Sequence, residues 1–250
     1  MLRHLGNHRN FRHNIRLAAI LCLTAGFVNI AGLLAFAVLT TNVTGHVAYF
    51  AESLAQGDLR LARIIVLWMF LFLLGAFSSS FIVSRIGRNQ VFAYTIPILI
   101  EFVILLLNGI YGYRYDGSLL LKEVFAGSLL FAMGLQNAMV SMISGAVVRT
   151  THLTGIFTDL GIDLAAATLP AHLRKPGLKQ RLILKLIIIL FFLAGAVAGG
   201  YSYSLLQQHT FLIPAGLLLV AMFYDISRVH LIKLFRHLQY RFWGSTARQV

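Results

Sequence analysis

The sequence predicts an all-α integral membrane protein with six transmembrane helices, arranged as two inverted three-helix repeats. Three observations lead to this fold class. Of 250 residues, 58% are hydrophobic and only 12% are charged, about half the charged fraction of a soluble domain. The apolar residues are gathered in runs of the length that crosses a bilayer. The two halves of the chain also share short motifs in the same order.

Six apolar runs are long enough to span a membrane, because a spanning helix needs about 20 mostly apolar residues. They cover about 17–39, 62–84, 91–109, 118–148, 182–205 and 210–232. Lipid offers the backbone no hydrogen-bond partners, so each run is expected to be helical. The membrane domain is therefore predicted over 17–232, with repeats over about 17–109 and 118–232.

The net charge of +13 predicts the orientation of these helices. With six spans, 17 of the 21 Lys and Arg residues fall on the side of the N-terminus, and Arg60, Arg63, Arg114 and Lys122 fall on the other. The excess of positive charge marks the cytoplasmic side. Both basic tails, 1–16 and 233–250, are thus expected in the cytoplasm. Nucleic acid is not an expected partner, because the basic residues alternate with apolar runs instead of forming one soluble face.

An internal repeat relates the two halves. The segment "AGFVNIAGLLAFAVLTTNVTG" matches "MGLQNAMVSMISGAVVRTTHLTG", and "FLFLLGAFSSS" later matches "LFFLAGAVAGG". Pro97 and Pro214 recur in the third helix of each half. Three helices per repeat place the second copy upside down, an arrangement found in many secondary transporters. The alternative is that duplication only produced a stable bundle.

The paired phrases "GFVN…TTNVTGHVAYFAESLAQGD" and "GLQNAMV…TTHLTGIFTDLG" resemble the YoaK-type family of bacterial inner-membrane proteins, a family with a domain of unknown function. The resemblance covers about 17–232 and implies a six-helix protein of the bacterial inner membrane. It implies no substrate. In addition, "SRIGRN" at 84–89 is weakly similar to a turn of major facilitator transporters, with Ser84 in place of its Asp. The alternative is a basic turn that obeys the positive-inside rule.

The phrases "TTNVTG" and "TTHLTG" are predicted to break one helix and start a short second one, over about 46–56 and 156–169. A helix N-terminus favours anions or polar oxygens. The alternative is a polar turn at the membrane surface. The predicted substrate pathway comprises the polar and glycine residues of both phrases and the amides upstream: Asn29, Thr40, Thr41, Asn42, Thr44, Gly45, Gln136, Asn137, Thr150, Thr151, His152, Thr154 and Gly155.

Three acidic residues are candidates for proton coupling. Glu101 is the only acidic residue deep inside a spanning run, where a charge is costly and function is the default interpretation. A neutral carboxyl between helices is the alternative. Asp159 and Asp163 are one helical turn apart. They either accept protons or pair with Arg149 and the basic segment 174–185.

Together these features predict a secondary transporter or permease for an unidentified small solute, proton-coupled and working by alternating access. The alternative is a non-transporting membrane scaffold or sensor. No enzyme activity, cofactor or metal site is expected, because no catalytic dyad or paired-His motif occurs and Cys22 is the single cysteine. The expected partners are the lipid bilayer, the solute and a second copy. Gly195 and Gly199 form a close-packing motif that lies either inside the bundle or at the contact with the second copy.

Overall fold

The computed structural model describes residues 11–87, 91–145 and 148–223, and within these residues the chain is helical with no strand. The α-helices are α1 (Phe11–Phe36), α2 (Val43–Ala55), α3 (Leu59–Ile86), α4 (Val91–Tyr111), α5 (Leu119–Ser144), α6 (Leu153–Ala167) and α7 (Leu178–Leu206). Three 3-10 turns join them, η2 (Gly112–Arg114), η3 (Ala171–Leu173) and η4 (Gln207–Phe211). A further helical stretch covers 212–223. The all-helical part of the prediction is therefore confirmed.

Five helical segments among the described residues are long and apolar enough to cross a membrane: Ala18–Phe36, Leu59–Ile86, Ala93–Arg114, Leu119–Ser144 and Leu178–Phe223. The last segment joins two of the six predicted runs, with η4 between them. These helices indicate a multi-pass membrane protein. The predicted run 210–232 is described only to Phe223, and the tail 233–250 lies outside the described residues. At the other end, α1 begins at Phe11, inside the predicted tail 1–16.

Glycines mark the crossing of α1 with α7, one of the two most extensive helix contacts. A Cβ on Gly26 would overlap the backbone carbonyl of Phe192, and a Cβ on Gly195 would overlap the carbonyl of Leu23. Small residues let two membrane helices approach this closely. Since Gly199 likewise approaches Phe27, contacts advance together along both helices, which therefore run in the same direction.

The crossing of α3 with α5 is built in the same way. A Cβ on Gly75 would overlap the carbonyl of Phe131, and a Cβ on Gly134 would overlap the carbonyl of Phe72. Gly134 corresponds to Gly26 in the repeat alignment. Each half thus contributes its first long helix to a glycine crossing with the second long helix of the other half, so the halves interlock rather than lie side by side.

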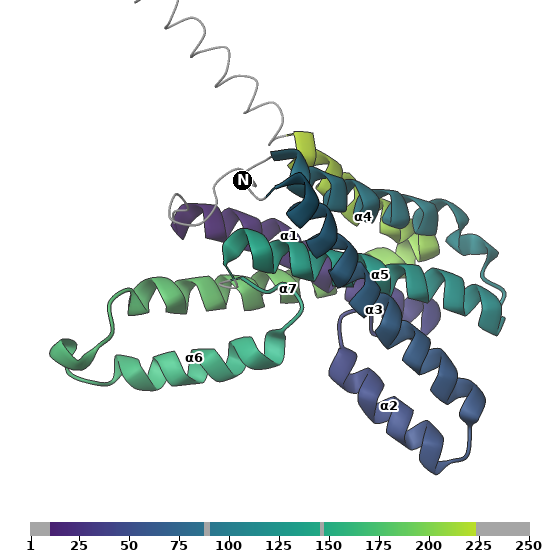
Figure 1. Cartoon of the computed structure of the whole chain (residues 1–250), viewed down its shortest axis with the longest axis horizontal. Coiled ribbons are helices and arrows are strands. Elements are labelled where there is room, and N and C mark those ends of the chain that lie inside the picture. Colours follow the sequence, from purple (N-terminus) through teal and green to yellow (C-terminus); the bar gives the residue numbers. More distant parts are fainter. Residues whose placement is uncertain (1–10, 88–90, 146–147, 224–250) are drawn as a thin grey trace, which may run out of the picture.

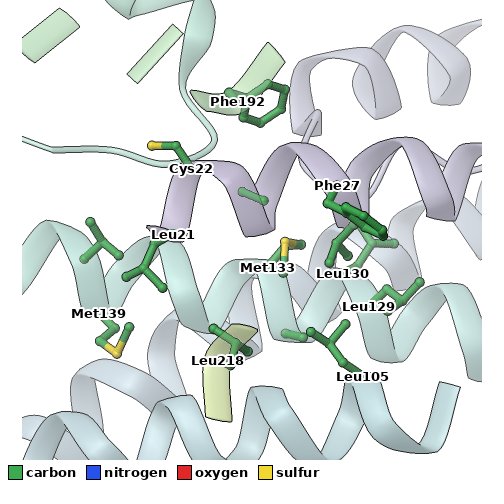
Figure 2. Close-up of a cluster of buried hydrophobic side chains, with 14 of the residues drawn as sticks. Leu21, Cys22, Phe27, Leu105, Leu129, Leu130, Met133, Met139, Phe192 and Leu218 are labelled. Atoms are coloured by element: carbon green, nitrogen blue, oxygen red, sulfur yellow. The ribbon is translucent and has the colours of Figure 1, made fainter. Parts of the chain in front are cut away.

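The core lies where these four helices meet α4. Figure 2 shows Phe27 of α1 beside Leu130 and Met133 of α5, with Leu105 of α4 below them, and all four are buried. By contrast, large apolar side chains cover the outer faces, such as Leu205, which is 83% exposed. Such an inside-out balance suits helices whose outer solvent is lipid.

The two short helices α2 and α6 fold back against α3 and α7, respectively. Figure 1 shows the α2–α3 and α6–α7 hairpins on opposite sides of the central crossing, with the start of each short helix toward the centre. Both short helices were predicted, but their start was placed too late. Thr44 and Gly45 already belong to the first turn of α2, and Thr154 and Gly155 to that of α6. The backbone therefore breaks two residues before each Thr-Gly pair, at Asn42 and His152, which are the N-caps of α2 and α6.

Candidate functional site

The break after α1 turns the chain back toward the middle of that helix. Ala37 ends α1 with a left-handed φ of 53°. The side chain of Thr40 then packs on Gly32, and the backbone N–H of Thr41 donates to Asn29 Oδ1 at 3.1 Å. Because Asn29 lies two helical turns before the end of α1, the break runs inward along the helix that it follows.

The start of α2 fixes this break from the other side. The Asn42 Oδ1 accepts from the backbone N–H of Gly45 at 3.0 Å, as an N-cap does. His46 Nε2 lies 2.8 Å from the carbonyl oxygen of Leu39, and its ring meets the Trp68 ring edge-on at 5.8 Å. A carbonyl only accepts, so Nε2 carries the proton. Residue 39 is thereby tied to the first turn of α2.

The break after α5 follows the same course, and in its described part a single side chain, Ser144, bonds the backbone of the break. Gly145 ends α5 with a left-handed φ of 64°, as Ala37 ends α1. Ser144 Oγ accepts from the backbone N–H of Val148 at 2.9 Å. His152 is the N-cap of α6 but makes no capping hydrogen bond with its side chain, and its ring lies against Gly155. Gly155 leaves room for this ring as Gly45 does for Asn42.

One cavity of about 200 Å³ joins the two breaks. It is lined by Asn29, Leu39, Thr41 and Asn42 from the first break and by Thr151, Leu153, Thr154 and Phe192 from the second half of the chain. We name it the central cavity. Two polar phrases more than a hundred residues apart in sequence therefore face the same space. The meeting follows from the interlocked helix crossings, since α1 carries Asn29 and its partner α7 carries Phe192.

Five of the predicted pathway residues line the central cavity: Asn29, Thr41, Asn42, Thr151 and Thr154. The others lie around it. The Thr40 and Thr150 side chains are fully buried, and their hydroxyls have no partner in the described part of the chain. Gly45 and Gly155 lie under the cap side chains, whereas Thr44 and His152 are exposed.

The two amides predicted on α5 differ in their contacts. Gln136 is buried and its Nε2 donates to the carbonyl oxygen of Leu21 at 3.0 Å, so it ties α5 to α1. The Asn137 Oδ1 is buried without a partner among the described residues. Asn29 accepts from Thr41 rather than from Asn137. Gln136 therefore bonds between two helices, whereas Asn29 bonds the first break.

The predicted acidic residues lie outside the central cavity. Glu101 is fully buried in α4, and neither carboxylate oxygen has a partner in the described residues. Asp163 of α6 contacts Lys185 Nζ at 2.6 Å and an Arg181 guanidinium nitrogen at 3.2 Å. Burial acts to raise the pKa of Asp163, but hydrogen bonds and charge from Lys185 and Arg181 outweigh it and hold this pKa below its usual value. Asp159 is exposed, and its backbone carbonyl accepts from Lys185.

A second cavity of about 330 Å³ lies between α2, α3 and the start of α5, with Tyr49, Glu52, Trp68 and Lys122 in its wall. We name it the lateral cavity. It also touches Ala37, so it reaches the first break. The Lys122 ammonium lies 5.6 Å from the Trp68 ring centroid, a cation–π distance.

Sequence reasoning missed Lys122 and Trp68, and also the apolar lining residues Leu39, Leu153 and Phe192. Lys122 offered a signal, since the sequence predicts it as one of four cations on the side away from the termini. The apolar residues offered none, because they look like any other residue of a spanning run.

Comparison with known proteins gives a family but no activity. Residues 17–224 match the model of a family described as "Protein of unknown function (DUF1275)". This match confirms the resemblance to the YoaK-type family. No curated protein and no solved structure matches the chain.

Proposed function

Since the chain belongs to the DUF1275 family, whose description assigns no activity, we propose from its own geometry that it is a secondary transporter for a small polar solute. The solute would bind in the central cavity and cross the bacterial inner membrane without chemical change. One observation carries this proposal: polar residues from two phrases, one in each half of the chain, line a single cavity. Secondary transporters bind their substrates at the interface of structural repeats, between broken helices.

The helix crossings support an inverted relation between the halves. Gly26 and Gly134 occupy corresponding positions, as do Gly75 and Gly195, and each pair meets a backbone carbonyl of the other half. With the N-terminus inside, α1 and α7 run outward while α3 and α5 run inward. The two halves would then be related by a two-fold axis in the membrane plane, and this axis would pass near the central cavity.

The depth of the breaks supports a re-entrant position for α2 and α6. His46 in the first turn of α2 packs on Trp68, about ten residues into α3, which places it ~15 Å from the start of α3 at 1.5 Å per residue. That is about half of the ~30 Å hydrocarbon thickness. Irregular backbone at such depth is tolerated only where it is buried or lines a cavity.

Glu101 is the residue we assign to proton coupling. An ionised carboxylate that is fully buried without a partner would be strongly disfavoured, so the resting side chain would hold a proton. A change of helix packing that admits water or a cation would release this proton. We assign Asp163 to a different task, the holding of α6 against α7, because two cations keep it ionised.

Cysteine accessibility tests the central cavity directly, because Cys22 is the single cysteine and is buried. In a Cys22→Ala background, Thr41→Cys and Thr151→Cys would be exposed to a membrane-impermeant methanethiosulfonate reagent in right-side-out and inside-out vesicles. Alternating access predicts that each thiol reacts from both sides. Leu73→Cys is the control, since Leu73 is 64% exposed on the outer face of α3, where lipid suppresses thiolate formation.

The same experiment separates the proposal from its alternatives. A scaffold with a closed interior would leave both cavity thiols unreactive from either side, and this result would contradict transport. Reaction from one side only would contradict alternating access. Flux is then measured in proteoliposomes with a panel of small neutral, cationic and anionic solutes, with and without an imposed pH gradient, against protein-free liposomes.

A further inference from the structure

We propose that the central cavity is a binding site for a small oxyanion, either a short carboxylate or an inorganic oxyanion. This inference rests on the proposed function, because it names the solute class of that site. Three observations support it. They are the amide and hydroxyl groups that line the cavity, the hydrogen bonds that already occupy the amide oxygens, and the two helix N-termini that face the cavity.

The two asparagines of the cavity present hydrogen-bond donors. Asn29 Oδ1 accepts the backbone N–H of Thr41 and Asn42 Oδ1 accepts the backbone N–H of Gly45. Each contact requires the oxygen, since a backbone N–H can only donate. The remaining NH₂ group of each amide is therefore the part left for the cavity that both residues line. These two donors are fixed in orientation by the backbone itself.

Thr41 adds a hydroxyl-bearing side chain to the cavity wall. Thr41 is only 8% exposed, and its hydroxyl makes no hydrogen bond within the described residues. Thr151 and Thr154 supply two further hydroxyls from the opposite break.

The short helices add positive electrostatic potential. Asn42 immediately precedes α2, and Leu153 and Thr154 form the first turn of α6, so both N-termini open on the central cavity. Helix N-termini attract anions. The negative C-terminal end of α1 does not cancel this effect, because it lies two turns beyond Asn29, ~10 Å away along the helix.

The residues that line the central cavity do not suit a cation. Among the described residues that line the cavity, none is acidic and none is basic. A bound cation would face donors and two positive helix ends with no carboxylate to balance it. An anion would be held by donors alone, without a salt bridge, which suits reversible binding. The volume of about 200 Å³ is below the range of drug-sized sites, ~300–1,000 Å³, and fits a solute of a few heavy atoms.

Calorimetric titration of the purified full-length protein in detergent tests the inference. The ligands are sodium acetate, nitrate and phosphate, with neutral acetamide and methylammonium as comparisons. Sodium HEPES supplies the ionic strength, because its anion is too large for the cavity. We expect saturable binding of at least one oxyanion, and the three arms separate carboxylate from inorganic oxyanion. We expect no saturable binding of acetamide or methylammonium.

Two isosteric variants test the proposed donors. Asn29→Asp and Asn42→Asp keep the oxygen that accepts the backbone N–H and replace the NH₂ group by a negative oxygen. Asp is also a good N-cap, so Asn42→Asp should fold. We expect each variant to weaken oxyanion binding at least ~10-fold, the size of one charge-assisted hydrogen bond. Gln207→Glu, on an exposed residue outside the cavity, changes the net charge equally and should bind as the wild type does.

Three results would overturn the inference: no saturable oxyanion binding, binding of acetamide or methylammonium instead, or wild-type oxyanion affinity in both Asp variants. The outcome is independent of transport. Oxyanion binding without flux in proteoliposomes would reject the transporter and keep the site. Flux of a neutral or cationic solute without oxyanion binding would keep the transporter and reject the anion.

Discussion

Three side chains bond the backbone or first turn at the first break, whereas in the described part of the second break only Ser144 does so, through the N–H and the carbonyl of Val148. Asn29, Asn42 and His46 all make hydrogen bonds within or beside the first break. In the second half, the α6 N-cap has no side-chain hydrogen bond, and Ile156 takes the position of His46. There the α6–α7 hairpin is fastened by Asp163 to two cations of α7.

The connection from each short helix to the next long helix is also shorter in the first half than in the second. Only Gln56, Gly57 and Asp58 separate α2 from α3, whereas residues 168–177 separate α6 from α7. The stability of a segment depends on its own contacts. The two breaks are therefore expected to differ in stability, although their backbones follow a similar course. We expect the first break to stay in place and the second to move when the central cavity opens. The following predictions test this difference, starting with a feature that the halves share.

The largest effect is expected at the shared glycine crossings. Gly26→Ala and Gly134→Ala each place a Cβ on a backbone carbonyl of the other half, which cannot move without displacing a helix. We expect each to cost more than about 3 kcal/mol, at or above the upper end of overpacking effects. Gly161→Ala is the control, because nothing lies within 4 Å of its Cβ position. Thermal unfolding in detergent is the measurement, and control-like melting of both variants would contradict the interlocked packing.

Glu101 of the first half has no acidic counterpart at the corresponding position of the second half. Its neutral isostere Gln should affect proton coupling without affecting folding. Glu101→Gln should lower the uptake that a pH gradient drives at least ~10-fold. This is a lower bound, since one proton-transferring group typically contributes ~10²-fold or more. The thermal stability of the variant should stay the same or rise, since a buried carboxyl with no partner among the described residues is replaced by an amide. Uptake in proteoliposomes is compared at imposed and collapsed gradients. Full gradient-driven uptake in the variant would remove Glu101 from the coupling mechanism.

The ion pairs of the second half should make its hairpin sensitive to salt and acid. Asp163→Asn should cost about 1–3 kcal/mol, because it removes a nearly buried partner of two cations, one of them substantially exposed. Hydrogen exchange of α6 is the measurement, with α2 as the internal control. If α2 loosens as much as α6, the halves are not held separately.

The pH dependence of this hairpin follows from the lowered pKa of Asp163. A carboxyl with a lowered folded pKa stabilises above its unfolded value, near 3.9, and this stabilisation is lost as the pH falls toward the folded value. Protection of α6 should therefore be constant near neutral pH and fall only below about pH 4. Asp163→Asn should remove the step.

The hydrogen bond between His46 and the Leu39 carbonyl can be removed by giving the first break the isoleucine that stands at the corresponding position, 156, of the second. His46→Ile copies Ile156 and leaves the Leu39 carbonyl without its donor, which should cost about 1–2 kcal/mol. Faster hydrogen exchange over residues 38–42 is expected. Ile156→His is the matched exchange and should not slow exchange at the second break. Unchanged exchange at the first break would show that His46 does not hold it.

The smallest effect concerns the residues that end α1 and α5. Ala37 and Gly145 both have a positive φ, of 53° and 64°, a region that glycine adopts without strain. Ala37→Gly should stabilise the protein by up to about 1 kcal/mol, and Gly145→Ala should destabilise it by about the same amount. Thermal unfolding measures both. Shifts of the same sign would show that the two helix ends are not equivalent.

The all-helical class, the long helices and both short helices could be predicted from the sequence, because they depend on local hydrophobicity and on cap residues next to the helix that they cap. The matched segments also contain Gly26 and Gly134, whose contacts with the other half come from the structure. Five of the thirteen predicted pathway residues line the cavity, since an amide or hydroxyl beside a helix break is recognisable from its neighbours.

The rest depends on contacts between residues far apart in the chain. A helix that ends early looks the same whether the chain then leaves the membrane or turns back, so the depth of the breaks came only from Asn29 with Thr41 and His46 with Trp68. The role of Phe192 and the donor orientation of Asn29 and Asn42 came from packing as well. By itself the sequence determined that two helices break and are each followed by a short second helix. Only the tertiary structure decided that the breaks meet, because the crossings of α1 with α7 and α3 with α5 join opposite halves.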